Sequence, residues 1–298
     1  MRSLAVIAAL WFVAASSLAT AQVQVAAQTT RTNFLLYERV DLLVTVTNIG
    51  ENDLVLNNDE GHPWLSFILT RHSQANYVPV RQERDSTFAQ LSLKAGKSKT
   101  LRINLTPLFA FREEGEYRAA AVVDLPGAGQ IISDNVPFNV AEGRKIWTQM
   151  RSVDGSQRIY SLIRFSPDVN TTSLYLRVEE PSDNLVYTNL SLGDMISFVD
   201  PDAFFDPQGN LHVLHNFSMG TYLYTRTNPD GKIVNQTIFK TFREVRPQLH
   251  KLADGNIVVV GGLQEDPNSP HEKLSDSQAG QVVKKADEPT APPPGTVQ

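Results

Sequence analysis

Short runs in which every second residue is apolar, separated by turn-forming residues, constrain the fold of this chain more than any other feature. Such alternation places apolar side chains on one face of a strand and polar ones on the other, as in antiparallel sheets with one buried face. No stretch carries a sustained helical period with caps. The sequence therefore predicts an all-β protein. The clearest runs span Val40 to Val46, Leu101 to Leu105, Tyr117 to Val123 and Val136 to Val140.

Two segments in the first part of the chain resemble immunoglobulin-like modules of bacterial proteins. Glu114-Gly115-Glu116-Tyr117 precedes a strand pattern and is similar to a tyrosine corner, in which the Tyr hydroxyl bonds to the chain just upstream. The segment from Val44 to Leu56 is similar to two early strands joined by an Asn-x-Gly turn. The resemblance covers about residues 34–140 and implies an immunoglobulin-like antiparallel β-sandwich over residues 22–142, but no activity. The cysteine pair of antibody domains is absent.

Glycine turns recur in the next part of the chain, residues 143–263. Gly209, Gly231 and Gly255 each lie in a turn-forming segment that precedes a β-rich run. Their spacing of 22 and 24 residues is similar to that of successive hairpins in β-propeller blades. About 120 residues suffice for two or three blades, whereas a closed propeller needs at least four. We therefore expect an antiparallel β-meander resembling partial propeller blades; a propeller completed by several chains is the alternative.

Residues 1–21 have the three parts of a removable export signal. Arg2 supplies the positive charge, Leu4 to Val13 forms the apolar core, and Ala19-Thr20-Ala21 presents small residues for cleavage between Ala21 and Gln22. The sequence thus predicts a secreted or periplasmic protein. No second apolar stretch has membrane-spanning length, so we expect no stable transmembrane segment after the signal is removed.

Composition narrows the class of protein further. The chain has no cysteine, which excludes thiol catalysis, thiolate metal sites and disulfide stabilisation. The formal net charge of −5 argues against non-specific nucleic-acid binding. A short, Ala-rich signal and the lack of cysteine favour a bacterial envelope protein. Residues 264–298 are rich in proline and charge and lack aromatic residues, which predicts a disordered tail.

Three carboxylates and two histidines are of the residue types that bind metal ions. Asp200, Asp202 and Asp206 lie within seven residues and are candidate calcium ligands, although their spacing differs from the EF-hand loop and Asp-Pro pairs also form turns. His212 and His215 fall on opposite faces of a predicted strand, which disfavours a shared metal. We find no catalytic motif and no cofactor-binding motif, and we predict no catalytic residue, cofactor or resident metal.

Tyr222 and Tyr224 are the candidate binding residues, because they share one face of a predicted strand and could stack on a sugar ring or a partner surface. The sequence favours an exported non-catalytic protein with a binding or structural role, whose partner is a protein or glycan of the cell envelope. Two alternatives stay open. One is a hydrolase or enzyme subunit whose site is built from loops around the three carboxylates. The other is an inhibitor of an exported protease.

Overall fold

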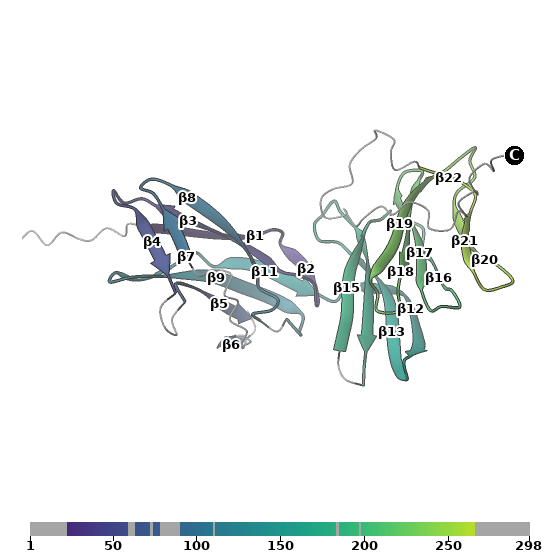
Figure 1. Cartoon of the computed structure of the whole chain (residues 1–298), viewed down its shortest axis with the longest axis horizontal. Helices are drawn as coiled ribbons and strands as arrows, with labels where there is room; N and C mark the ends of the chain where they lie inside the picture. Colours follow the sequence, from purple (N-terminus) through teal and green to yellow (C-terminus); the bar gives the residue numbers. More distant parts are fainter. Residues whose placement is uncertain are drawn as a thin grey trace, which may run out of the picture.

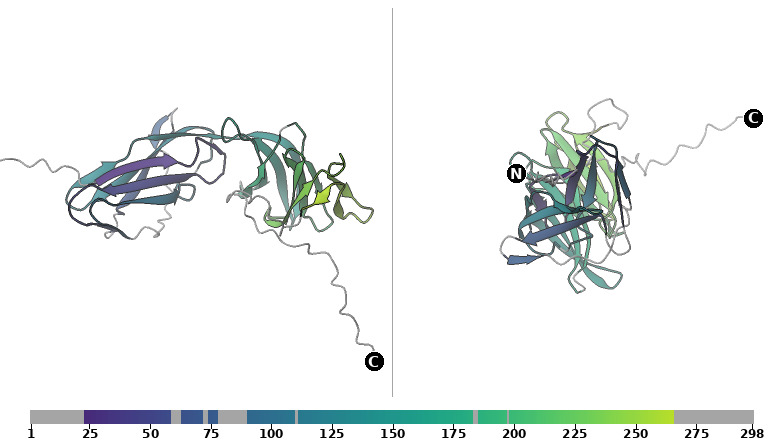
Figure 2. Two further views of the ribbon diagram at one scale, coloured as in Figure 1. Left: turned by 90° about the horizontal axis from the view of Figure 1, so that it is seen from above. Right: turned by 90° about the vertical axis from the view of Figure 1, so that its left-hand side faces the viewer.

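In this computed structural model the described residues are 23–58, 63–71, 74–77, 90–109, 111–182, 185–196 and 198–265. They form strands and turns and include no helix, so the all-β prediction is confirmed. Consistently, no helix of membrane-spanning length and apolarity occurs in this part of the chain. The predicted signal, residues 1–21, and tail residues 266–298 lie outside the described residues. Figure 1 shows two lobes, one containing β1 to β11 and the other β12 to β22, and Figure 2 shows them following one another along the long axis.

Two facing sheets build the N-terminal lobe, which we call the N-terminal module. All strand pairs in it are antiparallel except the parallel pair β2–β11. One sheet has the order β1 (Val23–Thr29), β3 (Asp41–Asn48), β8 (Ser98–Asn104). The other has the order β2 (Asn33–Leu35), β11 (Val136–Ala141), β9 (Gly115–Leu125), β5 (Leu65–Arg71), β6 (Gln74–Tyr77), with β10 (Gly129–Ile132) beside β9. A small third sheet pairs β4 (Leu54–Asn57) with β7 (Gln90–Leu93).

The alternating residues predicted to share a face do form the core of this module. Val40, Leu42, Val44 and Val46 are all at most 1% exposed, because successive side chains of β3 point to opposite faces of its sheet. The local hydrogen bond expected of a tyrosine corner is also present: the Tyr117 hydroxyl donates to the Glu113 carbonyl oxygen at 2.7 Å.

The C-terminal module consists of successive antiparallel meanders, as the repeated glycine turns indicated. We call β12 (Arg144–Val153), β13 (Ser156–Phe165), β14 (Ser173–Glu180) and β15 (Leu185–Asp194) the first sheet. The second sheet has the order β16 (Asp202–Phe205), β17 (Leu211–Ser218), β18 (Thr221–Thr227), β19 (Ile233–Lys240), β22 (Leu263–Gln264). The terminal hairpin pairs β20 (Gln248–Lys251) with β21 (Ile257–Val260). Because Gln264 belongs to β22 and the backbone of Glu265 bonds to Ile238, this module extends two residues beyond the predicted limit at residue 263.

The three glycine turns have the same pattern of backbone hydrogen bonds. In each turn the glycine N–H donates to the carbonyl three residues earlier, and a second backbone bond closes the loop one residue after the glycine. Gly209, Gly231 and Gly255 have φ values of +84°, +80° and +87°, a region that side chains with a Cβ rarely adopt. The turns close the hairpins β16–β17, β18–β19 and β20–β21.

The layers of the chain stack in order, and the central strands β13, β14 and β17 are buried along most of their length. Tyr160, Leu162 and Leu176 from the first sheet pack against Leu211 and Val213 from the second. The other face of the second sheet packs on the terminal hairpin through Leu214, Leu249 and Ile257. The other face of the first sheet meets the N-terminal module through Leu35, Ile163 and Tyr175. This stacking explains why β14 is buried along nearly its whole length rather than at every second residue.

Candidate functional site

A small cavity between the second sheet and the terminal hairpin gathers residues from both candidate sets found in the sequence. Its volume is about 60 Å³. Asp200 and Asp202 reach it from the segment that enters β16, and Tyr222 reaches it from β18. It lies at the end of the module where β16 and β18 begin and β17 and β19 end, which we call the β22 end (Figure 1). The full lining consists of Val199, Asp200, Asp202, Leu214, Asn216, Tyr222, Arg246, Pro247 and Gln248.

Both carboxylates at the cavity already have a partner. Asp202 opens β16 opposite Leu214, and its Oδ2 accepts a hydrogen bond from the Leu249 backbone N–H at 3.2 Å. This bond ties the terminal hairpin to the second sheet. Asp200 accepts a hydrogen bond from the Arg164 guanidinium at 3.1 Å, which places a positive charge beside it.

Asp206 has a separate structural role at the opposite end of β16. Its carboxylate accepts hydrogen bonds from the backbone N–H and side-chain amide of Asn210, both at 2.8 Å, and contacts His212 Nε2 at 3.1 Å. Although burial alone would raise the pKa of Asp206, the hydrogen bonds from Asn210 and His212 lower it below its ordinary value. The carboxylate therefore fastens the β16–β17 turn.

The three carboxylates suggested as calcium ligands are not brought together by the fold. The described residues include no group of three or more His, Asp or Glu side chains placed to hold a metal ion. The length of strand β16 separates Asp206 from Asp202, and the Asp200 carboxylate forms an ion pair with Arg164 instead.

Tyr222 and Tyr224 could bind by stacking only if the face that they share were exposed. They do share a face of β18, but both are half-buried and pack against the cluster of Leu214 and Leu249, because the terminal hairpin covers this face. The Tyr224 hydroxyl lies 2.8 Å from His212 Nδ1, and burial lowers the pKa of His212. Tyr224 is thus a core residue, whereas Tyr222 lines the cavity.

Exposed apolar side chains lie on the loops and the strand next to the cavity lining at the β22 end, and we call them the apolar rim. Phe198 and Met219 are each 92% exposed, and Phe242, Val245 and Leu263 are about half exposed. Three contacts bring their segments together: the Ile196 N–H bonds to the Asn216 carbonyl, the Thr241 N–H bonds to the Gly220 carbonyl, and Leu263 pairs with Lys240.

A tight turn with unusual backbone angles presents two members of this rim. Phe242 and Val245 close the turn with two backbone bonds, of 3.1 and 2.9 Å. Between them, Arg243 and Glu244 have φ values of 46° and 66°, a left-handed conformation that costs non-glycine residues on the order of 1 kcal/mol or more each. Such strain is concentrated at functional sites in many proteins.

Sequence reasoning missed most of this site. Arg246 and Gln248 belong to no motif, and the rim residues come from three loops and from the short strand β22. The glycine turns predict the sequence of hairpins along the chain. No local pattern shows which loops come together at one end of the stacked sheets.

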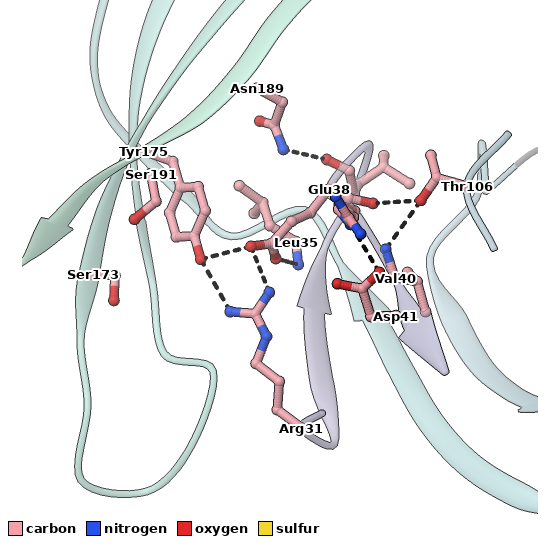
Figure 3. Close-up of polar contacts among 12 residues, drawn as sticks. Arg31, Leu35, Glu38, Val40, Asp41, Thr106, Ser173, Tyr175, Asn189 and Ser191 are labelled. Carbon is pink, nitrogen blue, oxygen red and sulfur yellow. Dashed lines mark hydrogen bonds and ion pairs between the residues drawn. The ribbon is translucent and has the colours of Figure 1, made fainter. Parts of the chain in front are cut away.

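A second polar cluster joins the two modules (Figure 3). The Tyr175 hydroxyl donates to Glu38 Oε1 at 2.9 Å and accepts from the Arg31 guanidinium at 3.3 Å, and Arg31 also forms an ion pair with Glu38. Burial, together with the nearby Glu38 carboxylate, raises the pKa of Tyr175 to about 12. Tyr175 therefore acts as a neutral hydrogen-bonding group at physiological pH.

A buried arginine completes this joint. Arg177 is fully buried on β14, donates to the Leu36 carbonyl at 2.8 Å and lies over the Tyr37 ring, 5.0 Å from its centre. Asn189 donates to the same carbonyl at 3.2 Å. Since these groups largely satisfy one another across the joint, we assign them to holding the modules together rather than to ligand binding.

Comparison with known proteins adds little. No protein-family model matches the chain, and no curated protein matches it. Among solved structures it is similar to Spo0M, a sporulation control protein from Bacillus subtilis, with 13% identity, a TM-score of 0.28, and coverage of 56% of this chain and 83% of that one. At this level the similarity supports no statement about fold or function.

Proposed function

We propose that the chain is an exported, non-catalytic binding protein of the bacterial envelope, which engages its partner with the β22 end of the C-terminal module. The export signal in residues 1–21 supports the location. The N-terminal module, an immunoglobulin-like sandwich in this proposal, would serve as a rigid support. Its two facing sheets and the bond between Tyr117 and Glu113 support that assignment.

The apolar rim is the observation that carries the proposal. Aromatic and methionine side chains standing 92% exposed are unusual on the surface of a soluble protein, and several together mark interaction sites. They lie next to a cavity with polar walls, which is the arrangement expected of a binding surface with an apolar contact area and a few orienting groups.

Capture of partners from a bacterial envelope fraction tests this proposal. The test variant combines Phe198→Ala with Met219→Ala, and the control is Met150→Ala, an exposed methionine on β12 in the first sheet. We expect the rim variant to lose the captured component and the control to retain it, with equal melting temperatures for all three proteins. Capture that is equal for the two variants would refute the proposal.

One observation favours a hydrolase as the second candidate: Asp200 and Asp202 line the same cavity. Paired carboxylates can act as general acid and base in hydrolysis. Turnover of a glycan, peptide or ester that disappears in the Asp200→Asn/Asp202→Asn variant would support this function. Absence of turnover by the unaltered protein would leave binding as its role.

A further inference from the structure

We infer that the ligand held at the β22 end is a neutral glycan, with one hydroxyl-bearing arm inserted in the cavity and a sugar ring against the apolar rim. This inference rests on the proposed binding function and adds the chemical class of the ligand.

The lining of the cavity offers both hydrogen-bond donors and hydrogen-bond acceptors. In the described part of the chain no hydrogen bond engages the Tyr222 hydroxyl, the Arg246 guanidinium or the Gln248 amide. In the orientation that satisfies its neighbours, the Asn216 amide nitrogen donates to the carbonyls of Ser218 and Thr221, which leaves Oδ1 as an acceptor. Sugar hydroxyls both donate and accept, so they match a set of this kind better than a purely cationic or anionic group does.

The charges around the cavity cancel. Asp200 and Asp202 contribute two negative charges, while Arg246 in the lining and Arg164, bonded to Asp200, contribute two positive ones. Because these charges balance, the cavity exerts no net attraction on a charged ligand. A neutral ligand matches this balance.

The size of the cavity sets how much of the ligand it can enclose. A volume of about 60 Å³ accommodates a hydroxymethyl arm or about two water molecules, but not a whole sugar ring. The ring must therefore lie outside, where Phe198 is 92% exposed next to the lining residue Val199 and offers an aromatic face for its C–H groups. One face of the Phe242 ring is covered by the Arg243 guanidinium.

Isothermal titration calorimetry of the purified protein tests the inference. The probes are chitotetraose, maltotetraose, cellotetraose and tetragalacturonic acid, the last as the acidic comparison, backed by an array of neutral bacterial oligosaccharides. We expect at least one neutral probe to bind, with an affinity that is the same at low and high salt. Arg246→Ala, Gln248→Ala and Phe198→Ala should each weaken binding about tenfold, as expected for loss of one good contact, and Met150→Ala should not.

Three results would overturn the inference: no neutral probe binds, only the acidic probe binds, or the Arg246 and Gln248 variants bind as tightly as the unaltered protein. Arg246 and Gln248 have exposed side chains, so these variants are expected to fold, and their melting temperatures verify it. If neutral glycans fail while the rim still captures an envelope protein, the glycan inference is wrong and the proposed binding function stands. If both assays fail, both are refuted.

Discussion

His215 makes the stability of the C-terminal module depend on pH in a way that can be calculated. The side chain is 1% exposed on β17, and its Nε2 lies 3.1 Å from the Asp194 carbonyl oxygen, where a neutral ring donates. Its other ring nitrogen, Nδ1, has no hydrogen-bond partner among the described residues. Burial lowers the pKa of His215 to about 4, because a protonated ring would be charged in an apolar layer.

The pKa of His215 has its ordinary value of 6.5 in the unfolded chain and is about 4 in the folded protein. At pH values between 4 and 6.5, the unfolded chain therefore binds a proton more readily than the folded protein does. Stability must therefore be greatest above pH 6.5 and fall as the pH drops towards 4. The linkage between proton binding and folding, applied to these two pKa values, gives a loss of about 2 kcal/mol in the free energy of unfolding between pH 7 and pH 5.

Urea unfolding at pH 7 and pH 5 measures this loss, followed by the fluorescence of Trp147, which packs against the core of the C-terminal module. All proteins carry Trp64→Phe, because Trp64 in the core of the N-terminal module also fluoresces. The matched variant is His215→Gln, which keeps a side-chain N–H donor but does not titrate. We expect the unaltered protein to lose about 2 kcal/mol more than the variant. His212, whose pKa burial also lowers, contributes equally to both proteins. Equal losses in the two proteins would show that His215 is not held neutral by burial.

Three further outcomes are expected. Tyr117→Phe removes the hydrogen bond to the Glu113 carbonyl and should lower the unfolding free energy of the N-terminal module by about 1 kcal/mol, measured by urea unfolding; an unchanged midpoint would contradict this. Gly143→Ala should lower the melting temperature by several degrees, because the residue has a φ of +74° and its Cβ would lie 2.9 Å from Leu35 Cδ1 at the joint. Mass spectrometry of the protein recovered from the envelope fraction should find Gln22 at the N-terminus, and retention of residues 1–21 would refute the predicted cleavage.

The strands were predictable wherever a single face is buried. Leu42, Val44 and Val46 share the buried face of β3, whereas Thr45 and Thr47 lie on the other face, and this period is visible in the sequence. The turns at Gly209, Gly231 and Gly255 were predictable for a related reason: their backbone angles require glycine whatever surrounds them.

The candidate site was predictable only in part. Asp200, Asp202 and Tyr222 stood out as residue types, but the sequence grouped Asp202 with Asp206 and Tyr222 with Tyr224. In the folded chain β16 separates the first pair, and the terminal hairpin covers the second. The partners that complete the cavity, Arg246 among them, come from a segment more than 20 residues further along the chain.

By itself, then, the sequence determined the strands and the hairpins, because alternation and left-handed glycine turns depend on neighbouring residues. Tertiary structure alone decided which sheet faces are covered, which carboxylates turn towards arginine, and which apolar side chains stay in solvent. The physical reason is that a pleated strand presents the same two faces whatever packs on them. The order of the layers depends on the free energy of burying whole sheet faces. That free energy comes from contacts between segments that are far apart in the sequence.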